Sequence, residues 1–326
     1  MGLKVNIFGS RGSIATPQSA YTIEEKVLCA LHGFFQAGYS EEKDIAKYFE
    51  SLTRSQKSSF GGNTACYKVD SDKQMIIIDG GSGLRSIGAQ LMKEECGQGN
   101  GEVHIFLTHF HWDHLVGFNF FIPLFIPGNK IHLYGVQDEI HEFLKVLFKK
   151  PYFPIEYKAL GAEIHYHQLE PRVPFQLNDM TITPYQLDHP DPCWGYRIES
   201  DGKSYAHCVD TECIRVSRKD LGEDLPLYQN ADLMIFDAQY SLNEAIQKTN
   251  WGHSAAVIGL DIAKREHIKQ AVFVHHDPYA SDKQIEEIVT ECIKTDELQK
   301  KRAKQKGEDV FDTSWCFGYD GLEIIL

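Results

Sequence analysis

Alternating hydrophobic and polar positions predict a series of short β-strands separated by glycine turns. Residues 3–9 alternate with period two and run into a glycine turn at 9–13, which predicts a first strand and a tight loop. Residues 64–69 and 74–79 predict a hairpin that turns at 70–73. Apolar runs predict further strands near 103–107, 131–134, 180–186, 196–199, 204–209, 233–236 and 272–274.

Helical patterning falls between these strands. It is predicted over 84–95, 138–149, 253–265 and 282–303, and a mixed-charge stretch at 20–57 predicts an inserted helical cap. The succession of strand, glycine turn and helix from Asp79 onwards is typical of βαβ units. No short repeat or low-complexity linker interrupts residues 1–326, so we expect a single α/β domain, built as a four-layer αββα sandwich of two mixed sheets with helices outside.

One segment is apolar and aromatic without a clear strand or helix pattern. Within residues 120–170, the stretches 120–127 and 152–154 are rich in Phe, Tyr, Ile and Pro. Such residues most often pack in a core, but a lid over a site or the surface of a homodimer also fits this composition.

Composition excludes several classes of protein. The chain has 326 residues, of which 42% are hydrophobic, which argues against disorder. Its formal net charge of −13 argues against long nucleic acid as a partner. No apolar run is long enough to span a bilayer, the start lacks the layout of a secretion signal, and the eight cysteines include no CxxC pair. We therefore expect a cytoplasmic protein with no membrane association.

The strongest chemical signal is a cluster of ligand-type residues directly after the strand at 103–107. His109, His111, Asp113 and His114 follow one another within six residues. Three imidazoles and a carboxylate suit Zn²⁺ as the expected ion, with Mn²⁺ or Fe as alternatives. A solvated polar turn is the alternative, but four such residues in this order favour a metal site.

Other predicted strands also end in ligand-type residues. His189 follows the strand at 180–186, Asp210 follows the strand at 204–209, and His275 and His276 follow the strand at 272–274. Taken singly, these residues suit a turn, a helix N-cap and a core histidine. Taken together with the first cluster, they indicate one shared site.

With these motifs in order, the sequence resembles the metallo-β-lactamase superfamily over nearly its whole length, except the insertion at 20–57. The closer likeness is to the phosphodiesterase branch near the tRNA 3′-processing endonucleases (tRNase Z) and cyclic-nucleotide phosphodiesterases. The segments that carry this likeness are Phe60-Gly-Gly-Asn-Thr64, Ile78-Asp-Gly-Gly-Ser-Gly-Leu84, Asp237-Ala-Gln-Tyr240, Gly252-His-Ser254 and Val274-His-His-Asp-Pro278.

The resemblance implies a centre of two divalent metal ions. One ion takes His109, His111 and His189, the other takes Asp113, His114 and His276, and Asp210 bridges them. Two such ions share a bridging hydroxide and clamp the oxygens of a phosphoryl displacement. Asp79, beside two glycines, is expected to orient a ligand histidine.

Two adjacent histidines compete for the last ligand position. His275 and His276 point to opposite sides of an extended strand, so only one can bind the metal. Aligning this segment with the strand ending seen in the family favours His276, and His275 stays the alternative.

Three features favour hydrolysis of a phosphodiester. The oxygen-reducing members of the superfamily typically carry Glu where this chain has His111. By resemblance His253 protonates the leaving oxygen, and we favour this role over the alternative of a helix-start residue. With Asp113 it completes the expected catalytic residues. The glycine loops 9–13 and 61–63 place backbone N–H groups and the guanidinium of Arg11 where they could face a phosphate.

The expected substrate is a small phosphodiester, with a cyclic nucleotide as the leading candidate. Val209 replaces the Gly usual in tRNA-processing enzymes, Asp277 falls where they carry a Ser-x-Arg pattern, and no long basic arm is present. Cleavage of RNA or DNA is the alternative within the same class. Thioester or lactam hydrolysis at the same centre, and a metal sensor without turnover, are alternatives from other classes.

Overall fold

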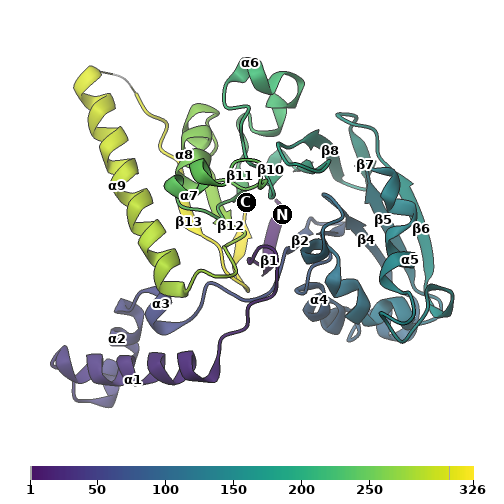
Figure 1. The fold of residues 1–326 in the computed structure, drawn as a ribbon, viewed down its shortest axis with the longest axis horizontal. Helices are drawn as coiled ribbons and strands as arrows, with labels where there is room; N and C mark the ends of the chain where they lie inside the picture. Colours follow the sequence, from purple (N-terminus) through teal and green to yellow (C-terminus); the bar gives the residue numbers. More distant parts are fainter. Residues whose placement is uncertain (1, 308) are drawn as a thin grey trace.

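Two seven-stranded β-sheets face each other in the computed structural model, which describes residues 2–307 and 309–326 (Figure 1). The first sheet has the strand order β14-β1-β2-β3-β4-β5-β6, and the second has the order β13-β12-β11-β10-β9-β8-β7. Helices pack on the outer faces of both sheets. The predicted four-layer αββα sandwich is confirmed.

The strands of the first sheet are β1 (Lys4–Gly9), β2 (Cys66–Asp70), β3 (Met75–Ile78), β4 (Glu102–Phe106), β5 (Lys130–Gly135), β6 (Glu163–Gln168) and β14 (Glu323–Ile325). Those of the second are β7 (Phe175–Leu177), β8 (Met180–Gln186), β9 (Trp194–Ser200), β10 (Lys203–Cys208), β11 (Leu233–Asp237), β12 (Gln270–Val274) and β13 (Ser314–Phe317). The α-helices are α1 (Ala20–Gln36), α2 (Ile45–Ser51), α3 (Arg54–Lys57), α4 (Leu84–Leu91), α5 (Phe143–Leu147), α6 (Arg218–Leu221), α7 (Leu242–Gln247), α8 (Ala256–Arg265) and α9 (Asp282–Lys306). Within the described ranges, none of these helices is long and apolar enough to cross a membrane.

The core has three apolar layers that follow from strand alternation. Val5 and Ile7 of β1 meet Ile235 and Val272 of the second sheet in the layer between the sheets. A second layer lies between the first sheet and α4, and a third lies between the second sheet and helices α8 and α9. Both sheets are therefore held rigidly, which fixes the loops at their ends.

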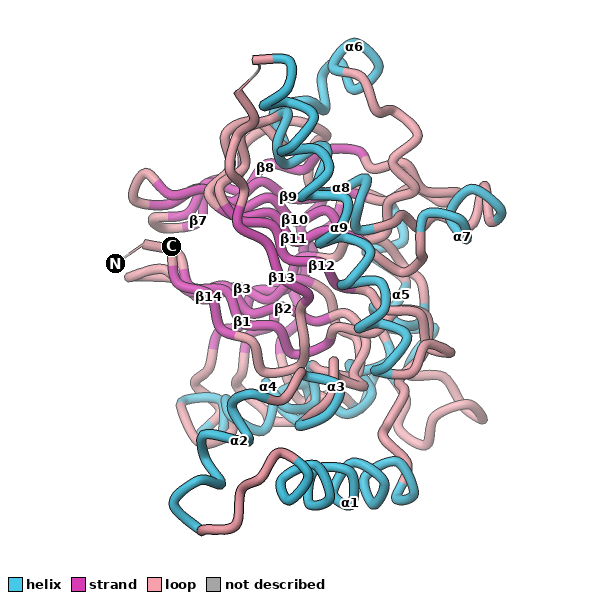
Figure 2. The backbone as a smooth tube through the Cα atoms, turned by 90° about the vertical axis from the view of Figure 1, so that its left-hand side faces the viewer, coloured by secondary structure: helices cyan, strands magenta, loops and turns pink. Residues whose placement is uncertain are grey.

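The stretch 20–57, where a helical insertion was expected, holds α1, α2 and α3. No residue of α1 is buried, and the helix lies at the margin of the molecule, apart from the sheets (Figure 2). An ion pair between Lys26 and Asp282 ties α1 to the first turn of α9. The insertion therefore contributes little to the core.

The apolar segment at 120–170 is largely structural. Phe121 and Leu124 are fully buried in the layer beneath α4, and β5 and β6 belong to the first sheet. The exceptions are exposed side chains, among them Phe120, Ile122, Val146 and Tyr152. The hydrophobic pattern does not predict β6, because its sequence, Glu-Ile-His-Tyr-His-Gln, is too polar for a typical strand. It does not predict β7, β13 and β14 either, because they have only three or four residues.

Candidate metal centre

The candidate site lies at the edge of the sandwich where parallel strands end. In the first sheet the loop after β4 carries His109, His111, Asp113 and His114, the last two in a short 3₁₀ turn (Trp112–His114). In the second sheet β8, β10 and β12 have the same direction, and each is followed by ligand-type residues. The alignment of strand ends gathers side chains from four distant segments.

Three histidines form the outer group of the site. One ring nitrogen each from His109, His111 and His189 lies within 4.8 Å of the others. His109 is buried, whereas the His111 side chain is 45% exposed and its Nε2 is 2.8 Å from Asp191 Oδ2. This group therefore opens to solvent on the side of His111.

A second group lies deeper in the molecule. Asp113, His114 and His275 bring ligand atoms within 4.8 Å of one another, and Asp210 forms a similar group with His109 and His114. Asp210 Oδ2 is 2.8 Å from His114 Nε2, and Asp210 Oδ1 is 3.2 Å from His275 Nε2. The Asp210 carboxylate therefore lies between residues of the outer and the deeper group.

The polar atoms of this cluster are buried and unsatisfied by the protein itself. His109 Nε2, His114 Nε2, His275 Nε2 and Asp210 Oδ2 make no hydrogen bond of good geometry with a described residue, although His114 Nε2 and Asp210 Oδ2 lie only 2.8 Å apart. Leaving several such atoms unpaired in one buried space is costly, and structures rarely tolerate it. Imidazole nitrogens and a carboxylate oxygen are the donors that first-row divalent cations prefer, so these residues fit bound metal ions.

Neighbouring carboxylates hold two of the rings in place. Asp79 Oδ2 is 2.7 Å from His114 Nδ1, and Asp79 also accepts hydrogen bonds from the backbone N–H and hydroxyl of Thr108. Asp79 therefore lies against the ring of His114, one of the histidines expected to bind a metal. Asp237 stands in the same relation to His253, with 2.9 Å between Oδ2 and Nδ1.

These surroundings shift the proton affinities of the histidines. Burial and the adjacent His114 lower the pKa of His109 well below its ordinary value, which keeps its ring neutral and able to bind a metal. Burial would also lower the pKa of His253, but Asp237 beside it prevails and raises that pKa to about 9. The two histidines therefore differ in their tendency to hold a proton.

Comparison with known proteins identifies the family. The model of the Beta-lactamase superfamily domain matches residues 75–276, more than half of the chain. The chain belongs to the beta-lactamase superfamily. The matched range includes every side chain of the two groups described above. The superfamily fold implies divalent metal ions, in agreement with the ligand atoms gathered here.

Relatives of this superfamily member include ribonucleases. Ribonuclease Z of Staphylococcus carnosus is 24% identical over 192 residues, which cover 54% of this chain and 58% of that enzyme. Among solved structures, the short form of human tRNase Z has a TM-score of 0.58 at 16% identity, covering 99% of this chain and 98% of that one. Yeast PDE1 has a TM-score of 0.60 at 13% identity, covering 100% and 99% of the two chains. These structural likenesses concern the fold.

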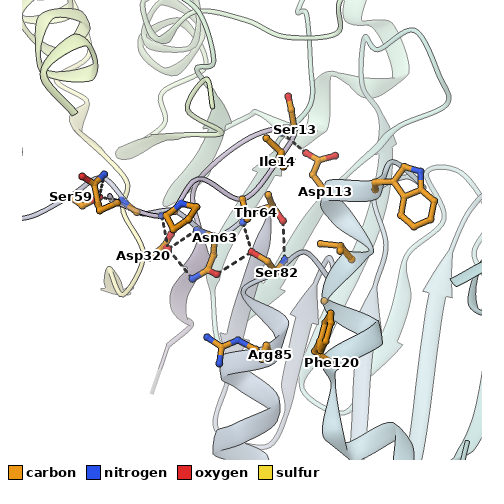
Figure 3. A pocket seen from close by; sticks show the side chains of 18 of the residues that line it. Ser13, Ile14, Ser59, Asn63, Thr64, Ser82, Arg85, Asp113, Phe120 and Asp320 are labelled. Carbon is orange, nitrogen blue, oxygen red and sulfur yellow. Dashed lines mark hydrogen bonds between the residues drawn. The ribbon is translucent and has the colours of Figure 1, made fainter. Parts of the chain in front are cut away.

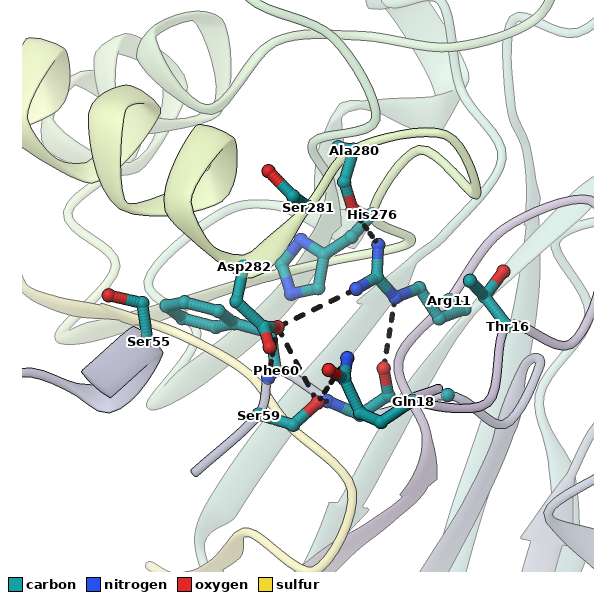
Figure 4. Close-up of polar contacts among 12 residues, drawn as sticks. Arg11, Thr16, Gln18, Ser55, Ser59, Phe60, His276, Ala280, Ser281 and Asp282 are labelled. Carbon is teal, nitrogen blue, oxygen red and sulfur yellow. Dashed lines mark hydrogen bonds and ion pairs between the residues drawn. The ribbon is translucent and has the colours of Figure 1, made fainter. Parts of the chain in front are cut away.

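We expected His276 to be the last metal ligand, but the structure does not place it in the cluster. His276 Nε2 is 2.9 Å from the carbonyl oxygen of Gly318, and its ring packs against Phe317. Phe60 also contacts this ring (Figure 4). His275 instead belongs to two candidate ligand groups, one with Asp113 and His114 and one with Asp210, Asp237 and His253. The structure therefore places His275 in the cluster and His276 in the core outside the second sheet.

The backbone explains why strand alternation misled this prediction. The strand ends at Val274, and His275 adopts a left-handed φ of 63°. Strand alternation assumes an extended backbone, so it does not predict where the side chains after Val274 point. Gly12 packs directly against the His275 ring, where an added Cβ would lie 2.4 Å from Cδ2. A side chain at this position of the loop 9–13 would collide with His275, so the position requires glycine.

We expected the two glycine loops to present free N–H groups and a guanidinium to a phosphate. The structure contradicts this expectation, because these groups are already paired within the protein. Arg11 is buried and donates hydrogen bonds to the carbonyl oxygens of Gly61, Asp277 and Ala280, while Asp282 lies 3.7 Å from its guanidinium (Figure 4). Asp320 accepts the N–H groups of Ser10, Gly62 and Asn63. Both loops are thus locked by internal partners.

Two residues important to this arrangement were missed from sequence. Asp237 ends β11 beside the cluster and was noted only as part of a resembling segment, although its place at a strand end was a usable signal. Asp320 comes from a loop near the C-terminus, and no local pattern marks it. Its role can be recognised only in the structure, where β1 and β14, from the two ends of the chain, lie side by side in the first sheet.

Proposed function

We propose that this chain is a metal-dependent phosphodiesterase that hydrolyses a small phosphodiester at a centre of two divalent ions. The observation that carries the proposal is the pair of neighbouring ligand groups with Asp210 between them. A two-ion centre suits the in-line displacement at a phosphorus atom. The names of curated relatives, which are ribonucleases, support the same reaction class.

The proposed ligands follow the two groups. His109, His111 and His189 would hold one ion, Asp113, His114 and His275 would hold the other, and Asp210 lies between the two groups. Zn²⁺ is the proposed ion because imidazole predominates, with Mn²⁺ and Fe as alternatives. Bound divalent ions supply Lewis acidity and make water a nucleophile at neutral pH.

Asp113 and His253 are the proposed catalytic residues. Asp113 accepts the backbone N–H of Ser13 at 2.8 Å and borders both the cluster and a neighbouring cavity, where a substrate would approach. The His253 ring lies 5.0 Å from the ring of His275, and its Nδ1 is held by Asp237. Its Nε2 is then left to give a proton to the leaving oxygen.

A small substrate, with a cyclic nucleotide as the leading candidate, fits the net charge of −13, which disfavours long polyanions. Cleavage of RNA is the second candidate, and the observation that favours it is the series of relatives named ribonuclease Z. The salt dependence of binding separates these substrates. The protein would contact several phosphates of a long RNA but only one phosphate of a cyclic nucleotide, so RNA binding should weaken more steeply with salt.

The proposed reaction is tested with bis(p-nitrophenyl) phosphate. We expect cleavage that a chelator abolishes and that Zn²⁺ or Mn²⁺ restores. A thioester and nitrocefin are assayed beside it. Turnover of either one without turnover of any phosphodiester would contradict the proposal, and metal-loaded protein inert on every ester would indicate a sensor.

The role of His253 is tested with leaving groups of different basicity. A p-nitrophenolate leaves without a proton, whereas a sugar alkoxide needs one, so His253→Ala is expected to slow a cyclic nucleotide far more than the p-nitrophenyl ester. Metal content should stay unchanged. Equal losses on the two substrates would rule out the proton-donor role.

A further inference from the structure

A cavity of about 850 Å³ adjoins the metal-ligand cluster, and Asp113 borders both (Figure 3). Loops 13–18 and 58–64, the start of α4 and residues 112–120 surround it. Its volume lies in the range of small-molecule sites. Apart from Asp113, no residue of the proposed mechanism lines this space.

One side of the cavity is apolar and open to solvent. Ile14, Trp112 and Phe120 line it and are 65%, 64% and 58% exposed. Large apolar side chains gathered around one cavity are typical of a binding surface, and aromatic rings suit a flat partner such as a nucleobase.

The opposite side is polar, but its groups are already paired. The Asp320 carboxylate takes the N–H groups of Gly62 and Asn63 together with the Asn63 amide. Thr64 and Ser82 exchange hydrogen bonds, each donating its backbone N–H to the other's hydroxyl. These groups shape the cavity and have little left to offer an anionic ligand.

Arg85 is the exception. It is the one Lys, Arg or His among the described residues that line the cavity, and it makes no hydrogen bond or ion pair with any described residue. It lies on α4, below Asp113 in the view of Figure 3. An unpaired guanidinium in a chain of net charge −13 is suited to bind a phosphate.

We propose that this cavity receives a nucleotide portion of the substrate and that Arg85 binds a second phosphate, distinct from the scissile one. The inference rests on the proposed phosphodiesterase function and deepens it. The base packs on the side of Trp112 and Phe120 while the scissile phosphate lies at the metal-ligand cluster. The preferred substrates are then nucleotide phosphodiesters that carry a phosphate besides the scissile one.

Two chromogenic esters with the same scissile bond test this. They are thymidine 5′-(p-nitrophenyl phosphate) and the same compound bearing a 3′-phosphate. We expect a KM about tenfold lower for the 3′-phosphorylated ester with similar kcat, as one charge-assisted contact commonly provides. Calorimetry with thymidine 5′-monophosphate and thymidine 3′,5′-bisphosphate measures the same preference without turnover.

Variants assign the preference to Arg85. Arg85→Ala should remove the tenfold difference in both assays and leave kcat and the hydrolysis of bis(p-nitrophenyl) phosphate unchanged, and Arg85→Lys should keep part of it. Lys93→Ala is the matched control, since Lys93 is an exposed cation just after α4 that does not line the cavity. Phe120→Ser should weaken both nucleotides alike.

The outcomes separate this inference from the proposed function. A protein that cleaves both esters but shows the same preference in wild type and Arg85→Ala overturns the inference alone. Absence of phosphodiester cleavage overturns the proposed function, and calorimetry then decides about Arg85 by itself. Equal binding of the two thymidine nucleotides to the wild type overturns the inference in either case.

Discussion

The histidines of the metal-ligand cluster differ from a second set of histidines in what their ring nitrogens face. The second set, here called the histidine row, comprises His104, His132, His165 and His167 on β4, β5 and β6. His104, His132 and His165 are paired in register across the parallel strands. Their rings stack 4.8 and 4.7 Å apart, with angles of 19° and 15° between their planes.

Some nitrogens of the row have close partners nearby, whereas His132 Nε2 and His165 Nε2 make no hydrogen bond with a described residue. His132 Nδ1 is 2.9 Å from His167 Nε2, and His104 Nδ1 is 2.9 Å from the Tyr134 hydroxyl. The nearest carboxylate, Glu102, is more than half exposed. None of the candidate metal-ligand groups found among the described residues includes a member of the row.

The cluster, by contrast, takes its rings from loops beyond the strand ends. Several residues there adopt left-handed backbone conformations, among them Asp79, Asp210 and His275, which turn side chains out of strand alternation. Rings from different segments then meet at angles around a buried carboxylate. Convergence on a carboxylate, and not the number of histidines, separates a metal site from a stack.

The largest effect is expected when the shared carboxylate is removed. Asp210→Ala should deplete metal and reduce phosphodiesterase activity by more than the ~10- to 100-fold that outer partners of metal ligands typically cost. His132→Ala, in the middle of the row, should keep both metal and activity. Elemental analysis and initial rates on the purified variants measure this. Loss of metal from the row variant would erase the distinction drawn here.

The adjacent histidines after β12 sharpen the comparison within one segment. His275→Ala is expected to lose one ion and most activity, because its Nε2 lies 3.2 Å from Asp210. His276→Ala should retain the metal and instead lower the free energy of unfolding by about 1–3 kcal/mol, since the Gly318 carbonyl loses its buried partner. Metal analysis and urea unfolding of both variants decide the assignment, and the opposite pattern would restore His276 as the ligand.

The fold and most of the cluster were predictable because their signals are local. Alternating apolar residues predicted the long strands correctly. Ligand-type residues directly after these strands indicated a site at one edge of the sandwich. His109, His111 and Asp113 needed no knowledge of distant contacts to be singled out. Parallel strands bring such ends together as a matter of topology.

What failed depended on backbone turns or distant partners. The choice between His275 and His276 depended on one left-handed residue, which alternation does not reveal. Arg11 was expected at a phosphate because its loop is rich in glycine, but Asp282 and three carbonyl groups from elsewhere in the chain hold it in the core. The histidine row was missed because β6 does not look like a strand.

A smaller effect is expected from the residue that orients a ligand. Asp79→Asn keeps the size of the side chain but loses the charge that faces His114 Nδ1, so metal affinity should fall about 10- to 100-fold. Competition with a chelating dye measures it. Glu102→Gln is the matched control, since Glu102 lies 3.1 Å from His132 in the row, and its affinity should equal that of the wild type.

The smallest effect on the metal centre is expected from the row, where protonation should act on stability alone. Burial, together with the neighbouring His132 and His167, lowers the pKa of His104 to about 4, against an opposing effect of Glu102. Between pH 6.5 and 4 the unfolded chain binds a proton that the folded chain does not, so the free energy of unfolding falls as the pH falls.

For this one group the loss between pH 7 and pH 5 is about 2 kcal/mol. His104→Gln should remove that part of the pH dependence, as measured by urea unfolding at the two pH values, and leave metal content unchanged. His165→Gln changes a row histidine whose side chain is 43% exposed and should leave the slope nearly as in the wild type. An unaltered slope in His104→Gln would show that His104 is not kept neutral in the folded protein, which would contradict this prediction.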